Sequence, residues 1–236
     1  MTESTVRYAL YFAPPQDNSW WPLLSRWLGY DACTGKDMPQ LDIAAISSSD
    51  FCAITEHPRH YGAHATLKAP FRLSPAYSEQ NLLEAVDIYA AGLTGFTLPE
   101  PRVELLKHFI ALVPSKADER INRIADDCTV QFDHFRAPLS DAEMARRLGE
   151  PLDELSRELL TKWGYPHVLQ RYQFHISLTG SLNTYSQQVT EAVLQTAHEF
   201  FSPLKHVALP FNAVCIFRQY SAEQRFTLIH RAGMNS

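Results

Sequence analysis

Two patterns of apolar residues alternate along this chain. Short apolar runs rich in β-branched and aromatic residues, bounded by proline or polar turns, alternate with segments whose apolar residues recur every three or four positions. The runs predict strands at residues 6–12, 64–72, 105–113, 172–179, 209–217 and 225–229. The periodic segments predict helices at residues 20–28, 78–92, 115–129, 140–163 and 184–201, the fourth broken near Pro151. Residues 30–60 follow neither pattern, and Pro39 and Pro58 mark them as irregular.

The order of these elements predicts an α+β fold. Strands far apart in the sequence alternate with single helices, and the nine glycines include no Gly-rich phosphate loop of the Rossmann kind. The second half repeats the order of the first, which predicts two similar lobes; if a pseudo-twofold axis relates them, both lobes face a central cleft. We expect a single domain over residues 1–236, with lobe one at about 1–130, a helical connector at about 138–165 and lobe two at about 166–236.

One short motif occurs twice. Residues 61–67 (YGAHATL) and 172–178 (YQFHISL) both read Tyr-x-x-His-x-Thr/Ser-Leu, and each opens a predicted strand that is followed by a helix. A histidine followed by a hydroxyl residue two positions later is common by chance, but the shared Tyr and Leu make coincidence a poor explanation. We interpret the two segments as an internal duplication.

The motif carries acid-base chemistry. On a strand, residues i and i+2 share a face, so His64 projects beside Thr66, and His175 beside Ser177. Two imidazoles can divide general base and general acid work near neutral pH, and hydroxyls can donate to phosphate oxygens. If both pairs face one cleft, they form a catalytic site for phosphodiester cleavage that needs neither a metal nor a cofactor.

Six neighbouring residues are further candidates for substrate and phosphate binding: Lys68, Thr179, Tyr61, Tyr172, Arg59 and Arg171. The first two continue the strand faces of the histidines and are expected to extend the site toward a second anionic group. The tyrosines fall on the opposite face of an ideal strand, which leaves packing and binding as alternatives. The arginines precede the motifs, and solvent exposure is as consistent with their position as phosphate binding.

Composition and charge argue against several classes of protein, such as membrane proteins and proteins that bind long nucleic acids. The 236 residues are 45% hydrophobic, which is typical of a folded globular protein, and no apolar run is long enough to cross a bilayer. Twenty-one basic against 26 acidic residues give a net charge of −5, so we expect no binding of long nucleic acids and no membrane partner. The start of the chain has no leader pattern, and the four isolated cysteines are typical of reduced thiols. We therefore expect a cytoplasmic protein.

Other histidines and two tryptophans are candidates for other roles, as metal ligands and as core residues. His57, His60 and His64 have the spacing of a helical metal site, but Pro58 and Gly62 argue against a helix there, so no metal is expected. Trp20 and Trp27 belong to an apolar helix face and are expected in the core.

Five segments carry a resemblance to a known family: residues 7–14, 59–71, 135–139, 163–166 and 174–180. With the paired His-x-Thr/Ser motifs, they resemble the 2H (two-histidine) phosphoesterase superfamily, which includes the LigT-like RNA cyclic phosphodiesterases. They are most similar to the branch encoded in phosphonate-utilisation operons. Ala63 and Ala65 depart from the bulkier residues usual there, but both motif histidines are intact.

The resemblance implies a duplicated two-lobe fold of antiparallel sheets flanked by helices, with a pseudo-twofold axis and a central cleft. For the site it implies a catalytic pair, His64 and His175, with Thr66 and Ser177 as phosphate-binding hydroxyls. It also implies a substrate, a small cyclic ribose phosphate or nucleotide, with a phosphoribosyl 1,2-cyclic phosphate as the expected compound in phosphonate breakdown. An RNA 2′,3′-cyclic phosphate processing enzyme and a non-catalytic nucleotide- or RNA-binding module remain alternatives. The sequence leaves open which histidine is the base, which ring bond opens and the oligomeric state.

Overall fold

The computed structural model describes residues 6–43, 46–149 and 151–236. Its seven described α-helices are α1 (Trp20–Leu28), α2 (Ser48–Tyr61), α3 (Glu79–Ala91), α4 (Glu119–Gln131), α5 (Asp141–Leu148), α6 (Glu154–Trp163) and α7 (Gln187–Phe201). Short 3-10 turns are η1 (Asp133–Phe135), η2 (Leu169–Arg171) and η3 (Ser202–Leu204). Along the described chain, no helix is both long and apolar enough to span a bilayer.

The strands form antiparallel sheets, which confirms the predicted α+β class. The larger sheet has the order β11 (Thr227–Gly233), β10 (Ala213–Gln219), β1 (Arg7–Phe12) and β4 (Ala65–Phe71). A second sheet has the order β6 (Pro101–Leu106), β7 (Phe109–Pro114) and β8 (Ile176–Ser177). Two small ribbons complete the set: β2 (Tyr30–Asp31) with β3 (Lys36–Asp37), and β5 (Phe96–Thr97) with β9 (Pro210–Phe211).

Each main sheet draws strands from both halves of the sequence. The C-terminal β10 pairs with β1, and β8, from the second half, pairs with β7 from the first. The sheets therefore do not coincide with the expected lobes at residues 1–130 and 166–236, because antiparallel pairing returns each half to the sheet of the other. The pseudo-twofold axis stays a prediction.

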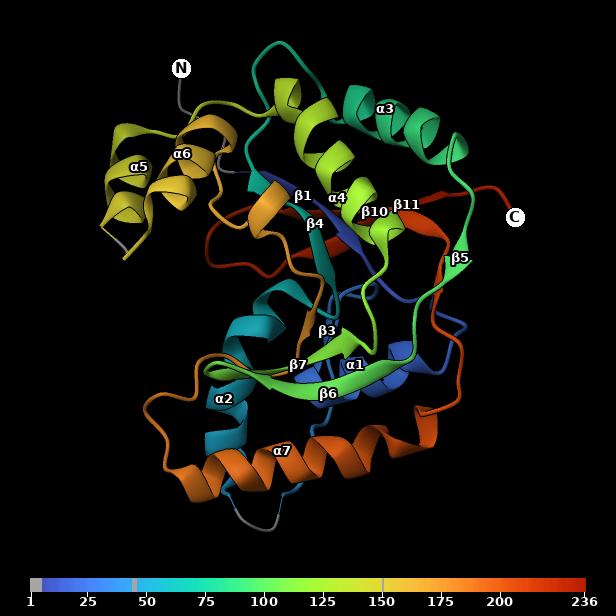
Figure 1. Cartoon of the computed structure of the whole chain (residues 1–236), viewed down its shortest axis with the longest axis vertical. Helices are drawn as coiled ribbons and strands as arrows, with labels where there is room; N and C mark the ends of the chain where they lie inside the picture. The colour runs from blue at the N-terminus through green and yellow to red at the C-terminus, as the bar shows by residue number, and fades with distance from the viewer. Residues whose placement is uncertain (1–5, 44–45, 150) are drawn as a thin grey trace.

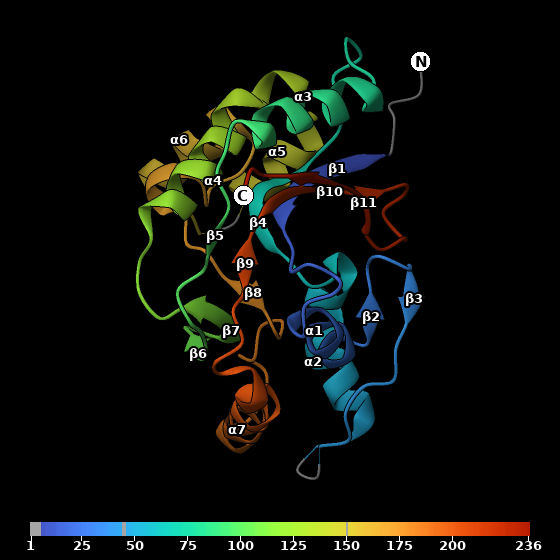
Figure 2. The same cartoon turned by 90° about the vertical axis from the view of Figure 1, so that its right-hand side faces the viewer.

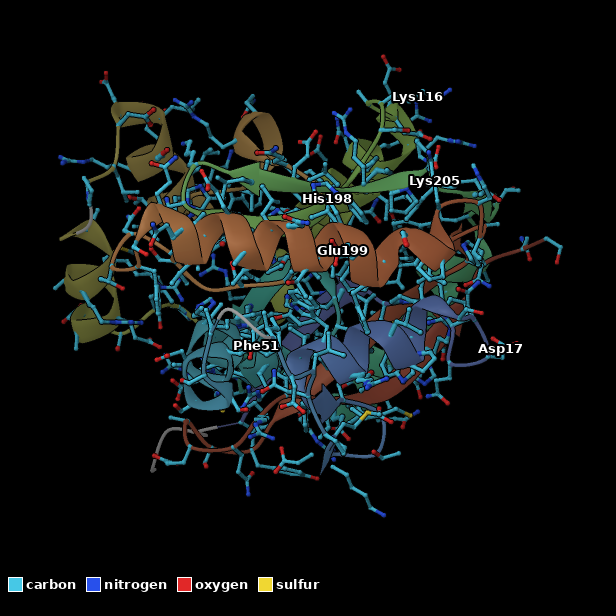
Figure 3. All side chains as sticks on the ribbon, turned by 90° about the horizontal axis from the view of Figure 1, so that it is seen from below. Asp17, Phe51, Lys116, His198, Glu199 and Lys205 are labelled. Carbon is cyan, nitrogen blue, oxygen red and sulfur yellow. The ribbon has the colours of Figure 1, made fainter. Side chains whose placement is uncertain are left out.

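Helices cover the sheets on their outer sides. α3 packs on β10 and β11, and α4 packs on β4, so these two helices lie over one face of the larger sheet (Figures 1 and 2). α7 packs on β6 and lies beside α1, where Phe201 contacts Trp20 and Trp27 at ring-centroid distances of 6.1 and 5.6 Å (Figure 3). Both tryptophans are buried, as predicted.

The first strand shows why the apolar run is continuous. Tyr8, Leu10 and Phe12 enter the main core beneath the helices, whereas Ala9 and Tyr11 enter a smaller core on the other face. Because both faces of β1 are covered, apolar residues are favoured at successive positions.

The prediction of irregular structure at residues 30–60 is wrong, because α2 spans Ser48–Tyr61 with Pro58 inside it. Pro58 has no N–H to donate to the carbonyl of Ile54. That carbonyl instead accepts the backbone N–H of Gly180 at 2.7 Å. A long-range hydrogen bond therefore replaces the one that the proline removes, and it joins α2 to the segment after the second motif.

Two predicted strands also differ. The expected strand at 105–113 is the hairpin of β6 and β7, whose two-residue turn has Lys107 at φ 54°. The expected strand at 172–179 is limited to Ile176–Ser177, because η2 precedes it and the backbone N–H groups of Leu178 and Thr179 both donate to the Ile110 carbonyl. Paired donation to one acceptor is a β-bulge, which ends regular pairing there.

Candidate active site

The first motif begins where α2 ends. Gly62 follows Tyr61 with φ 78°, and a Cβ at this position would lie 2.5 Å from the Ala32 Cβ, so only glycine fits the turn. The turn directs the Gly62 carbonyl toward the His64 ring, whose Nδ1 lies 2.9 Å from it. Thr66 follows on β4, the edge strand of the larger sheet.

The second motif repeats this local geometry. His175 precedes β8, the edge strand of the smaller sheet, and its Nδ1 lies 2.8 Å from the Gln173 carbonyl. In both motifs the imidazole therefore pairs with the carbonyl two residues earlier. A backbone carbonyl can only accept, so Nδ1 carries the proton and donates it, which leaves Nε2 as the free nitrogen of each neutral ring.

The two motifs face one cleft. β4 and β8 are in contact, and a cleft of about 530 Å³ opens between the sheets. Its lining includes all four motif side chains predicted to act together: His64, Thr66, His175 and Ser177. This volume lies within the range of small-molecule sites.

Burial lowers the pKa of both motif imidazoles, and more strongly for His64. It lowers the pKa of His64 to about 4; the hydrogen bond to the Gly62 carbonyl opposes this shift, and the charges of His175 and His57 add to it. The Tyr11 ring packs on the His64 ring at a centroid distance of 4.0 Å, with Tyr61 at 5.6 Å. Burial also lowers the pKa of His175, whose described ring neighbour is Phe109 at 5.4 Å. Both imidazoles are therefore neutral at pH 7 in the free protein.

The cleft is electropositive. Besides the motif residues, it is lined by three arginines, two further histidines and three tyrosines: Arg7, Arg146, Arg147, His57, His167, Tyr11, Tyr61 and Tyr165. No Asp or Glu of the described chain is among the lining residues. In a chain of net charge −5, this concentration of basic groups favours an anionic ligand.

Most of these additional residues were not predicted. Arg7 and Tyr11 belong to an apolar strand, and only the long-range pairing of β1 with β4 brings Tyr11 opposite Thr66. Arg146 and Arg147 lie on a charged helix whose pattern indicates a solvent-exposed connector. Ser47, which caps α2 by accepting the Asp50 N–H, is a sequence signal that can identify the helix carrying His57.

Lys68 and Thr179 lie outside the cleft lining, contrary to the expectation from strand alternation. Register shifts between β1 and β4 place Tyr11 opposite Thr66 but Leu10 opposite Lys68. Because Leu10 and Tyr11 point to opposite faces, Lys68 points away from Thr66, and its Nζ binds the Thr129 carbonyl and Asp133 at 3.0 and 3.2 Å. Thr179 lies in the bulge that follows β8, where its Oγ1 accepts the Ile110 N–H at 2.9 Å.

The candidate tyrosines and arginines separate into different roles. Tyr61 lines the cleft, whereas Tyr172 packs against the main core with its hydroxyl buried. Arg59 is buried and donates to the Leu28 carbonyl, the Thr55 hydroxyl and the Gln40 side chain, which makes it a structural residue. Arg171 is exposed and pairs with Asp153.

The histidine-rich segment offers no described metal centre. α2 does bring His57 and His60 onto one helix, but His60 Nε2 contacts the Gln219 side chain at 2.7 Å. Among the described residues, no group of three or more His, Cys, Asp or Glu side chains is placed to hold a metal ion.

Fold and site together define a class: an α+β protein whose two sheet edges bring paired imidazole and hydroxyl groups to one basic cleft. Residues 66–227 match the model of a family described as a protein of unknown function, DUF1045. Because this match covers well over half of the chain, the chain belongs to that family.

Two curated relatives carry the name ribose 1,5-bisphosphate phosphokinase PhnN. The protein from Janthinobacterium sp. (strain Marseille) is 35% identical over 219 residues, which are 92% of this chain and 48% of the relative. The protein from Laribacter hongkongensis (strain HLHK9) is 32% identical over 178 residues, which are 75% of this chain and 41% of the relative. The chain thus spans about half the length of these relatives or less.

Among solved structures, Usb1 of Kluyveromyces marxianus overlaps 97% of this chain and 100% of its own, with 11% sequence identity and a TM-score of 0.35. That overlap is too low to define a shared fold.

Proposed function

We propose that this chain is a cyclic phosphodiesterase of the two-histidine type that opens a small cyclic ribose phosphate. The observation that carries the proposal is the matched pair His64 and His175, each with Nδ1 on a backbone carbonyl and each lining a cleft that has no Asp or Glu among its described residues. This arrangement leaves two Nε2 atoms for proton transfer and attracts the anion between them. Because the two imidazoles account for both proton transfers, the reaction needs no metal.

His64 acts as the base and His175 as the acid. Burial holds the pKa of His64 to about 4, so its Nε2 is free to take a proton from water. The anionic phosphate, once bound, raises the pKa of the nearby His175, which then enters the reaction protonated. Water attacks phosphorus as His64 removes its proton, a new P–O bond forms, and the bond to one ring oxygen breaks. His175 protonates that leaving oxygen, so one water is consumed and one hydroxyl and one phosphate monoester result.

The hydroxyls stabilise the phosphate in this scheme. Thr66 and Ser177 line the cleft beside the two histidines, each on the edge strand that follows its histidine. Their O–H groups donate to the non-bridging oxygens, whose charge grows in the transition state.

The names of the relatives favour a phosphoribosyl substrate. These proteins are named for a kinase that acts on ribose 1,5-bisphosphate, and this chain matches half of their length or less. The sequence contains no G-x-x-x-x-G-K-S/T loop, so we assign to it a hydrolytic step and not the kinase step. Opening 5-phosphoribosyl 1,2-cyclic phosphate at the bond to O2 yields ribose 1,5-bisphosphate. The proposed reaction therefore supplies the compound in the relatives' name, as expected for phosphonate breakdown.

The experiment is hydrolysis of 5-phosphoribosyl 1,2-cyclic phosphate in ¹⁸O-labelled water, with the product phosphates located by phosphorus NMR. We expect one labelled oxygen on a phosphate attached to C1. A phosphate attached to C2 retains the enzyme class but refutes the regiochemistry. Faster turnover of an RNA oligomer ending in a 2′,3′-cyclic phosphate favours RNA-end processing. Binding without turnover favours a non-catalytic module.

A further inference from the structure

Three arginines line the cleft together with the catalytic pair. Arg7 lies on β1, and Arg146 and Arg147 lie in the last turn of α5. The proposed hydrolysis of the ring phosphate gives these three arginines no role. Their number is notable because one phosphodiester carries a single negative charge.

None of the three arginines forms an ion pair within residues 6–43, 46–149 and 151–236. Arg7 donates to the neutral Gln219 side chain at 2.7 Å, Arg147 donates to the Gly164 carbonyl at 2.5 Å, and Arg146 is exposed with no described hydrogen bond. Other cationic residues around the same sheet do have carboxylate partners, as in the pairs Lys68–Asp133, Arg72–Glu143, Arg136–Asp133 and Arg218–Glu79.

The three charges act on one another. Burial is the largest cause that lowers the pKa of Arg147, and the charges of Arg146 and Arg7 lower it further, against the opposing charge of Glu143. Glu143 itself pairs with Arg72 at 3.0 Å and caps α5 through Ser140. Like charges gathered without a free carboxylate repel one another, and an anion that binds among them relieves this repulsion.

Tyr11 provides a second, independent observation. Its side chain is only 1% exposed and lines the cleft, yet its hydroxyl has no hydrogen-bond partner in the described parts of the chain. It shares a face of β1 with Arg7, four residues earlier, and its ring packs on His64. The hydroxyl is therefore a donor with no described protein partner, on a side chain that lines the cleft beside the catalytic histidine.

The helix that carries two of the arginines is fixed in place. The Arg72–Glu143 pair ties α5 to the end of β4, and the Arg147–Gly164 hydrogen bond ties it to the end of α6. The cleft of about 530 Å³ is lined both by the two catalytic histidines and by the three arginines. The cleft thus has room and charge for a second anionic group.

We propose that Arg7, Arg146 and Arg147, with the Tyr11 hydroxyl, form a subsite for a second phosphate monoester of the substrate, separate from the ring phosphate at His64 and His175. The inference rests on the proposed function and names its substrate class: a cyclic ribose phosphate with a phosphate monoester at the far end of the sugar. Arg146 is the residue to test because it is exposed and bonded to nothing in the described fold.

The test compares 5-phosphoribosyl 1,2-cyclic phosphate with ribosyl 1,2-cyclic phosphate, which lacks the second phosphate. The wild type is expected to favour the first by at least about tenfold in kcat/KM. Arg146→Gln is expected to lower that ratio at least about fivefold. Arg123→Gln, an exposed helical arginine on α4 outside the cleft lining, is the matched control and is expected to leave the ratio unchanged. An equal loss on both substrates, or an unchanged ratio in Arg146→Gln, overturns the subsite.

A binding measurement separates this inference from the proposed function. Ribose 5-phosphate has the second phosphate but no ring phosphate, so its binding, followed by calorimetry, requires no turnover. If the wild type hydrolyses neither cyclic substrate, the proposed function fails, and weaker ribose 5-phosphate binding in Arg146→Gln than in Arg123→Gln still supports the subsite. Equal binding by wild type and Arg146→Gln removes it.

Discussion

The two copies of the motif differ in their surroundings more than in their local geometry. In both, Nδ1 donates to the carbonyl two residues earlier, and the chain bulges just after the hydroxyl residue. The first copy follows an α-helix and packs His64 on Tyr11, whereas the second follows a 3-10 turn and has Phe109 beside His175. One sequence pattern thus sets the tautomer of both rings, and the packing around each ring sets its pKa.

The largest expected effect tests whether both copies are catalytic. His64→Ala and His175→Ala should each lower kcat/KM at least about 100-fold, because each removes one proton transfer. Steady-state kinetics measure the loss, and circular dichroism with thermal unfolding checks that both variants fold. Near-wild-type activity in one variant would show that its histidine takes no part in catalysis.

The pH dependence of kcat/KM tests the difference between the rings. A base whose pKa is about 4 gives a rise as pH increases through 4, and an acid whose pKa lies below 6.5 gives a fall above it. We expect an acidic optimum and a decrease of at least about 30-fold by pH 8. Ribosyl 1,2-cyclic phosphate is the suitable substrate, because it lacks a monoester that titrates nearby. An optimum above pH 7 contradicts the assignment.

The pH dependence of the free energy of unfolding tests the difference in burial between His64 and His175 without any substrate. The folded pKa of His64 lies near 4, below the value of about 6.5 in an unfolded chain, so the unfolded state binds more protons as pH falls. The free energy of unfolding should therefore decrease by about 2 kcal/mol between pH 7 and pH 5 through this residue. Urea unfolding at both pH values should show that decrease reduced in His64→Gln, and reduced less in His175→Gln. Equal reductions mean that the rings are equally buried.

Removing either motif hydroxyl, that of Thr66 or that of Ser177, should lower kcat/KM by a similar factor. Thr66→Ala and Ser177→Ala each remove one donor to the phosphate, at a cost of about 1 to 2 kcal/mol, which corresponds to about tenfold in kcat/KM. Kinetics of both variants on one substrate give the two values. A folded Thr66→Ala protein with no activity at all points instead to a nucleophilic threonine.

The smallest effect on activity is expected at Thr179 and tests the bulge. Thr179→Val removes the Oγ1 that accepts the Ile110 N–H but keeps the side-chain volume. It should lower the free energy of unfolding by about 1 to 3 kcal/mol and leave kcat/KM within about twofold. A large loss of activity at unchanged stability places Thr179 in the site after all.

Short-range patterns predicted a substantial part of this molecule. The segments that became α1, α3 and α7 have helical periodicity, and Ser78 and Ser186 cap α3 and α7. The His-x-hydroxyl spacing predicted that His64, Thr66, His175 and Ser177 share one cleft, and all four line it. Such features depend on residues within a few positions of each other, so the sequence contains the information directly.

The predictions that were wrong share a physical cause, which is backbone hydrogen bonding between segments far apart in the sequence. Alternation predicted Lys68 and Thr179 beside the histidines, but bulges against β1 and β7 turned them away. Pro58 indicated the absence of a helix, yet the Gly180 N–H, more than a hundred residues away, satisfies the carbonyl that the proline leaves free.

Composition, periodicity and local motifs were enough to predict the α+β class, the paired histidine and hydroxyl residues and the absence of a Gly-rich phosphate loop. The folded structure was needed to show that β10 joins β1, that Arg59 is buried in a hydrogen-bond network and that Arg7, Arg146 and Arg147 line the histidine cleft. These features depend on which distant segments pack together. That choice is made by the whole core, since burial and charge at each position depend on neighbours that the chain supplies from far away.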